Sequence, residues 1–147
     1  MKRAYFAAAG YTFLGLILGF FYREFTKSHD FTGPSQLTGT HTHVLALGTL
    51  FFLIVLVLDK HFTLSSTRLF TAFFWTYNLG LLLTVAMMVT HGILTVTNHT
   101  VSPAISGIAG LGHIIVSIGV ILFFMCLYTP LMTAAEHPEP AKTPAAE

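Results

Sequence analysis

Residues 69–96 read LFTAFFWTYNLGLLLTVAMMVTHGILTV, and residues 104–135 read AISGIAGLGHIIVSIGVILFFMCLYTPLMTAA. No Asp, Glu, Lys or Arg occurs between Arg68 and Glu136. A helix crosses the hydrocarbon core of a bilayer with about 20 apolar residues, so this stretch can hold two spans and the turn between them. Asn98, Ser102 and Pro103 supply the turn chemistry. The stretch therefore predicts a transmembrane hairpin.

Two further uncharged runs precede this hairpin, from Ala4 to Tyr22 and from Phe31 to Leu58. Only 9% of the 147 residues are charged and 54% are hydrophobic, whereas a soluble domain has roughly 25% charged residues. Lipid offers no hydrogen-bond partners to the backbone, so apolar spans of this length must be helical. We therefore predict an all-α integral membrane protein, a four-helix bundle. The net charge of +1 gives no electrostatic reason to expect nucleic acid as a partner.

The predicted organisation is one transmembrane domain over residues 1–130, followed by a tail. Its helices are expected near residues 4–22, 40–58, 69–93 and 107–128. The first of these runs is longer than the apolar core of a typical signal peptide and has no clear cleavage site, so it is taken as a helix of the domain. Residues 131–147 are rich in Pro, Ala and Glu and are expected to form a disordered cytoplasmic tail.

The distribution of Lys and Arg predicts the orientation of the chain, because cytoplasmic loops carry an excess of these residues. On one side of the predicted membrane lie Lys2, Arg3, Lys60, Arg68 and Lys142. Only Arg23 and Lys27 lie on the other side. Both termini are therefore expected in the cytoplasm, with the first and third loops outside.

Eight histidines in so apolar a chain point to a function. His41, His43, His91 and His113 fall within predicted helices, all in the outer half of the bilayer. The apolar run that follows His43 ends at Leu58 and spans only about 22 Å at 1.5 Å per residue, so the helix must include His41 and His43 to cross. An imidazole at that depth costs several kcal/mol unless its nitrogens have a partner or a metal.

Helical spacing predicts where these histidines face. His41 and His43 are two residues apart and diverge by about 200°, so each is expected to serve a different site. His91 shares a face with Tyr77, Thr84 and Met88. The face of His113 carries small and polar residues, namely Ser106, Gly110 and Ser117. Stripes of this kind face protein rather than lipid.

Three uses of the histidines remain open from the residues alone. They could hydrogen-bond across the bundle as structural elements. They could hold copper or zinc, with His91, Met87 and Met88 as a copper-binding set, although such a site needs three or four converging ligands. They could also ligate haem, which suits apolar helices rich in Phe. In the haem hypothesis Arg23, which otherwise pairs with Glu24 or solvent, neutralises the propionates.

The chain resembles a bacterial family of four-helix membrane proteins known only as a domain of unknown function. The resemblance covers the chain to about Leu127 and implies a bacterial inner-membrane protein without implying an activity. The motifs that carry it are Tyr22-Arg23-Glu24-Phe25, His41-Thr42-His43-x-x-x-Leu47-Gly48, Met88-x-x-His91-Gly92 and the segment from Ser106 to His113.

The His41-x-His43 pair is also similar to a motif in the catalytic subunit of haem–copper oxidases and nitric oxide reductases. In that family the two histidines ligate two different haems, and twelve helices form a pseudo-threefold arrangement of four-helix units. The resemblance implies a homotrimer that imitates this twelve-helix core. The present chain has no adjacent His-His pair for copper and no Glu or Lys inside a span. Oxygen reduction coupled to proton pumping is therefore not expected.

The histidines within the predicted helices and the similarity of the His41-x-His43 pair together predict a membrane haem protein, a b-type cytochrome that transfers electrons. In the trimer, His41 of one subunit and His43 of the next are expected to coordinate one iron. His91 and His113 would then support the haem or form a further site, and a quinol or a redox protein would be the partner. The alternatives are oxygen or nitric oxide sensing at a haem with a labile ligand, a quinol-linked reductase, a haem-free copper carrier and a structural subunit.

Overall fold

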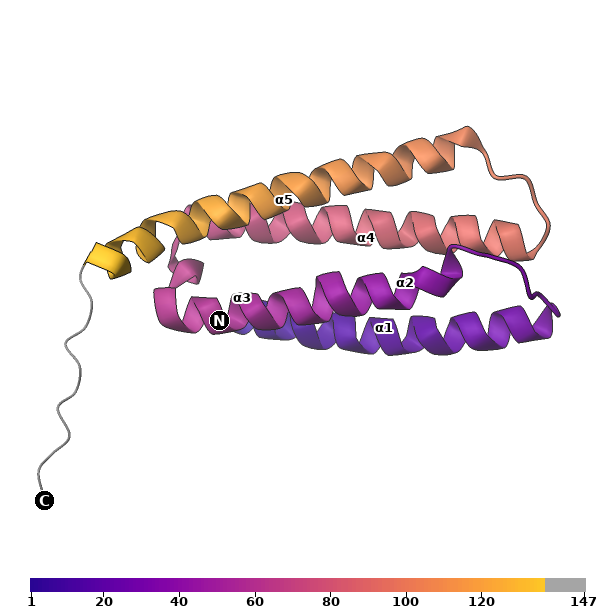
Figure 1. Ribbon diagram of the computed structural model, residues 1–147, viewed down its shortest axis with the longest axis horizontal. Helices are drawn as coiled ribbons and strands as arrows, with labels where there is room; N and C mark the ends of the chain where they lie inside the picture. The colour runs from indigo at the N-terminus through magenta and orange to yellow at the C-terminus, as the bar shows by residue number, and fades with distance from the viewer. Residues whose placement is uncertain (137–147) are drawn as a thin grey trace, which may run out of the picture.

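The computed structural model describes residues 1–136, which fold into long helices joined by short loops (Figure 1). α1 covers Lys2–Ser28. The second membrane-length helix, Leu37–Phe62, is continuous but has three parts: α2 (Leu37–His43), the π-helical η1 (Val44–Leu50) and α3 (Phe51–Phe62). A short 3₁₀ turn, η2 (Leu64–Ser66), leads to α4 (Arg68–Val96), and α5 covers Pro103–Glu136. In the described part of the chain there are four membrane-length apolar helices and no strand.

The helices run lengthwise beside one another, each antiparallel to the next (Figure 1). α1 packs against the Leu37–Phe62 helix, and α5 packs along α4, which has its closest neighbours in α5 and α2. The N-terminus and the α3–α4 connection lie at one end of the molecule, and the loops before α2 and after α4 lie at the other. We name these the inner end and the outer end after the orientation predicted from the sequence.

The observed helices extend beyond the predicted ones at both ends. The second begins at Leu37 rather than near residue 40, and the last continues to Glu136. Residues 131–136 therefore differ from the predicted tail, because Leu131 and the residues that follow favour helix and Pro130 removes only one hydrogen bond from the ladder. Residues 137–147, the rest of that predicted tail, lie outside the described residues.

An aromatic cluster fills the core toward the inner end of the molecule. The rings of Phe51 and Tyr77 stack with centroids 4.4 Å apart, and Phe73 and Phe123 meet at 5.1 Å. The cluster consists of Phe51, Phe52, Phe70, Phe73, Tyr77 and Phe123. These side chains come from α3, α4 and α5 and tie the two helical hairpins together.

Glycines allow the closest helix contacts. A Cβ on Gly80 would lie 2.5 Å from the backbone nitrogen of Val116, and one on Gly119 would lie 2.8 Å from the Cα of Tyr77. Gly15 of α1 instead faces the side chain of Leu45 in η1, whose Cδ2 a Cβ would meet at 2.7 Å. Small residues let helix backbones approach each other closely. Inside a membrane, this close packing takes the place of the hydrophobic effect in driving helix association.

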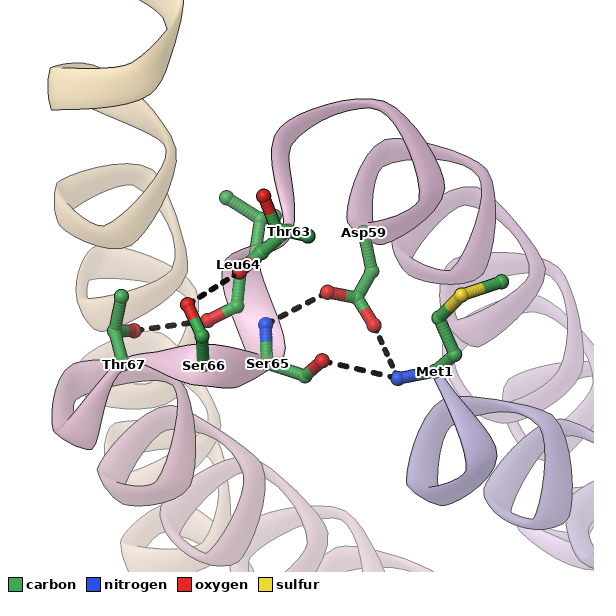
Figure 2. Close-up of polar contacts among 7 residues, drawn as sticks. All are labelled: Met1, Asp59, Thr63, Leu64, Ser65, Ser66 and Thr67. Carbon is green, nitrogen blue, oxygen red and sulfur yellow. Dashed lines mark hydrogen bonds and ion pairs between the residues drawn. The ribbon is translucent and has the colours of Figure 1, made fainter.

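A buried carboxylate anchors the inner end (Figure 2). Asp59 is fully buried near the end of α3, where one oxygen accepts a hydrogen bond from the backbone N–H of Ser65 at 2.6 Å and the other pairs with the α-ammonium group of Met1. The same ammonium donates to the Ser65 hydroxyl at 3.1 Å. One side chain thus fixes the start of α1 and the α3–α4 connection to the end of α3.

Candidate functional site: a histidine-lined groove

A groove of about 340 Å³ lies toward the outer end between α2, α4 and α5. α4 and α5 contribute most of its lining residues, and α2 contributes His43. It is lined by Gln36, His43, Met87, Met88, His91, Ser106, Ala109, Gly110 and His113. Three of the four histidines predicted to lie within helices therefore gather at one site, although they come from three different helices.

The rings of His43 and His113 are held in the same way. His43 Nδ1 lies 3.0 Å from the carbonyl oxygen of Gly39, and His113 Nδ1 lies 2.8 Å from that of Ala109. A carbonyl oxygen can only accept, so in each neutral ring Nδ1 carries the proton and Nε2 keeps its lone pair. This arrangement is the one found in metal-ligating histidines. It is not sufficient by itself, since His29 makes the same contact with Phe25 outside the groove.

α4 contributes thioether sulfur atoms and an imidazole to the groove. Met87, Met88 and His91 all line it, and the His91 ring lies 3.4 Å from the Thr95 hydroxyl through Nδ1. The methyl group of Met88 and the His43 ring both approach Gly39, where a Cβ would meet them at 3.8 Å and 3.7 Å. Met88 and the His43 ring therefore both approach Gly39 of α2.

His41 faces a different neighbour, as its spacing from His43 predicts. Its ring lies against Gly19 of α1, where a Cβ would meet it at 3.8 Å. Its Nδ1 is buried and has no hydrogen-bond partner within residues 1–136, and its Nε2 lies 3.4 Å from the Thr42 hydroxyl. The structure thus separates His41 from the groove that contains the other three histidines.

Arg23, the predicted partner of haem propionates, does not line the groove. Its side chain is exposed near the outer end of α1, and its guanidinium Nε lies 3.8 Å from the carboxylate of Glu24. Among the described residues, the charged partner of Arg23 is Glu24, as its position in the sequence suggested.

The groove does not form a closed metal-ion site of the usual kind. Among residues 1–136, no three His, Cys, Asp or Glu side chains are placed to hold one ion. Haem needs only one or two axial ligands from the protein. The donor set of the groove therefore fits haem iron better than it fits zinc.

Two features of this region could not be predicted from the spacing of residues in the sequence. Gln36 reaches the groove from the loop that precedes α2. The seven residues after His43 are π-helical, and the Leu47 carbonyl oxygen there accepts a hydrogen bond from Tyr77. The sequence predicted the face that Tyr77 shares with His91 but not this contact.

A family model described as a protein of unknown function, DUF2871, matches residues 1–130. The chain belongs to the DUF2871 family. The match confirms the predicted membership of a family without an assigned function, over nearly the predicted extent. In this DUF2871 chain the groove and the Asp59 anchor both lie inside the matched residues. No curated protein and no solved structure matched the chain.

Proposed function

We propose that this protein holds a b-type haem in the groove, with His43 as one axial ligand. The observation that carries the proposal is the His43 ring itself. It belongs to a helix long and apolar enough to cross a membrane, lines the groove, and has its Nδ1 committed to Gly39, which leaves Nε2 for iron. Bound there, haem would supply one-electron transfer, and the apolar surroundings would keep water from the iron.

His113 is the second axial ligand that the geometry of one chain favours. It lines the same groove from α5 and also keeps its Nε2 free. His113 is exposed in the single chain, where lipid would offer its imidazole no partner. Two histidine ligands leave no open position on the iron, which favours electron transfer over gas binding. One labile ligand would instead allow oxygen or nitric oxide to bind.

A homotrimer is the alternative source of the second ligand. In that arrangement His41 of a neighbouring copy approaches the iron held by His43, as the similarity to the oxidases implies. The unpartnered Nδ1 of His41 favours it, because an imidazole without partners is costly inside a membrane. Arg23 of the neighbouring copy would then lie near the propionates. The partner for electrons would be a quinol or a redox protein.

Copper binding is the second candidate function, and the two thioethers favour it. Met87, Met88 and His91 lie on one wall of the groove, and sulfur with imidazole is a ligand set that suits Cu(I). This candidate predicts copper in the purified protein and no visible absorption band. It needs no contribution from His41.

The test is an absorption spectrum of the detergent-purified protein, produced with ample haem, before and after dithionite. A Soret band with a sharp α band on reduction is expected. His43→Ala should remove it, whereas His29→Ala, which loses a ring held in the same way outside the groove, should not. His113→Ala and His41→Ala then distinguish the single-chain site from the trimer. A colourless protein that takes up no added hemin would refute the haem proposal and leave copper analysis to decide.

A further inference from the structure

The helix that carries His43 changes its geometry directly after this residue. Val44–Leu50 is π-helical, and the N–H of Phe51 donates to the carbonyl of Ala46, five residues back. In an α-helix that N–H would donate to Leu47. Isolated π segments are rare and are found mostly at functional sites. This π segment begins directly after His43, which lines the groove.

Tyr77 of α4 contacts the π segment through its hydroxyl. The hydroxyl donates to the Leu47 carbonyl oxygen at 2.9 Å, and the Tyr77 side chain is only 1% exposed. Its ring is already fixed, because it stacks on Phe51 and meets Phe52 edge-on with centroids 5.6 Å apart. A shift of Leu47 away from this position would leave a buried hydroxyl without a partner, which is costly in an apolar core.

The π segment also determines the direction in which His43 faces. A π turn accommodates about one residue more than an α turn between the same ends. If Val44–Leu50 became regular α-helix, the residues before it would rotate by about 100° relative to α3, the angle of one residue. His43 would then leave the groove that contains His91 and His113.

We propose that Tyr77 is a positioning residue that holds Val44–Leu50 in the π conformation and thereby directs His43 into the groove. The consequence for haem rests on the proposed function. The consequence for the direction of residue 43 does not.

The experiment compares three variants of the full chain. Tyr77→Phe removes the hydroxyl and keeps the ring. Tyr11→Phe is the matched control, because Tyr11 is also buried and stacks on Phe52, but its hydroxyl donates to Asn78 at 2.7 Å. The third variant combines Tyr77→Phe with deletion of Ala46, an exposed residue of the π segment. With one residue fewer, a regular α-helix can connect α2 to α3. The side chains of α2 then keep nearly the same directions relative to α3 as in the parent protein.

Two measurements follow, one of which needs no haem. In a Cys126→Ser background, His43→Cys and Gly110→Cys are introduced together, and a short bis-thiol cross-linker measures whether the two positions still face one groove. Hemin titration of the same Tyr variants with His43 intact measures affinity. We expect Tyr77→Phe to lower both cross-linking and affinity by about tenfold, because the π form loses a buried hydrogen bond. Tyr11→Phe should change neither, and deletion of Ala46 should restore both.

Equal cross-linking in the Tyr77→Phe and Tyr11→Phe proteins would overturn the positioning role. If Tyr77→Phe alone does not accumulate, the double variant decides: recovered cross-linking supports the role, and its absence overturns it. If no variant binds hemin, the haem proposal fails while cross-linking still decides what Tyr77 does.

Discussion

Gly112 of α5 lies directly against the backbone of Thr84 in α4. A Cβ on Gly112 would lie 2.5 Å from the Thr84 side-chain oxygen, 3.0 Å from its backbone nitrogen and 3.2 Å from its Cα, so rotation of the side chain alone would not relieve the crowding. Gly107, in the same helix, has nothing within 4 Å of the corresponding position. Of these two glycines, only Gly112 makes a helix contact.

Gly112→Ala should therefore separate α4 from α5 and destabilise the protein by about 1–3 kcal/mol, the usual cost of overpacking. Thermal unfolding in detergent measures the effect. Gly107→Ala is the control and should be neutral or slightly stabilising, because alanine is the better helix former. Equal melting temperatures for the two variants would contradict the close packing described at Gly112.

Gly110 offers a way to fill the groove without disturbing the fold. It lines the groove, and a Cβ there would meet nothing within 4 Å. Gly110→Leu should keep the parent melting temperature but lower hemin affinity at least about tenfold, because a buried ligand and a new side chain would compete for the same volume. Gly107→Leu, equally unobstructed but outside the groove, should bind hemin like the parent. The opposite ranking would place the ligand elsewhere.

Asp59 should contribute to stability through its charge. Asp59→Asn keeps an oxygen to accept from Ser65 but removes the partner of the Met1 ammonium. Loss of a buried charge-assisted interaction typically costs about 1.5–3 kcal/mol. Glu24→Gln removes one negative charge from an exposed site and should change the melting temperature little. Blocking the Met1 amine should destabilise the parent but have little further effect on Asp59→Asn, which a double-mutant cycle would show.

The predicted orientation places the α3–α4 connection in the cytoplasm and the outer end outside. In a Cys126→Ser background, Thr100→Cys should react with a membrane-impermeant thiol reagent in intact cells. Ser66→Cys should react only after the membrane is opened. Both positions are exposed, so accessibility of the side chain does not bias the comparison. Labelling in the reverse order would place both termini outside.

The sequence predicts the four helices well because each depends on one property, an uncharged apolar run of sufficient length. The same rule misplaces the helix ends, since the last helix is predicted to end before Pro130, whereas α5 continues past it through Leu131 and Met132, which favour helix. Helical spacing also predicts that His41 and His43 face different neighbours. The structure agrees, with His41 against Gly19 and His43 in the groove.

The groove itself could not be predicted from spacing along single helices. It depends on how α2 and α5 are placed around α4, and no periodicity within one helix contains that information. The π segment is invisible for a related reason. It depends on a hydrogen bond between Leu47 and Tyr77, which are distant in the sequence, and its residues have no composition that distinguishes π-helix from α-helix.

The position of the aromatic cluster has a consequence for how the molecule can deform. Stacked and edge-on rings resist changes in helix separation, and they lie toward the inner end. At the outer end α2 packs against α1 and α4 but meets α5 across the groove. The aromatic packing therefore gives the chain uneven mechanical compliance, stiffer where the rings interlock and softer where the groove separates α2 from α5. The separation of α2 from α5 can therefore change while the aromatic core of the protein stays as it is.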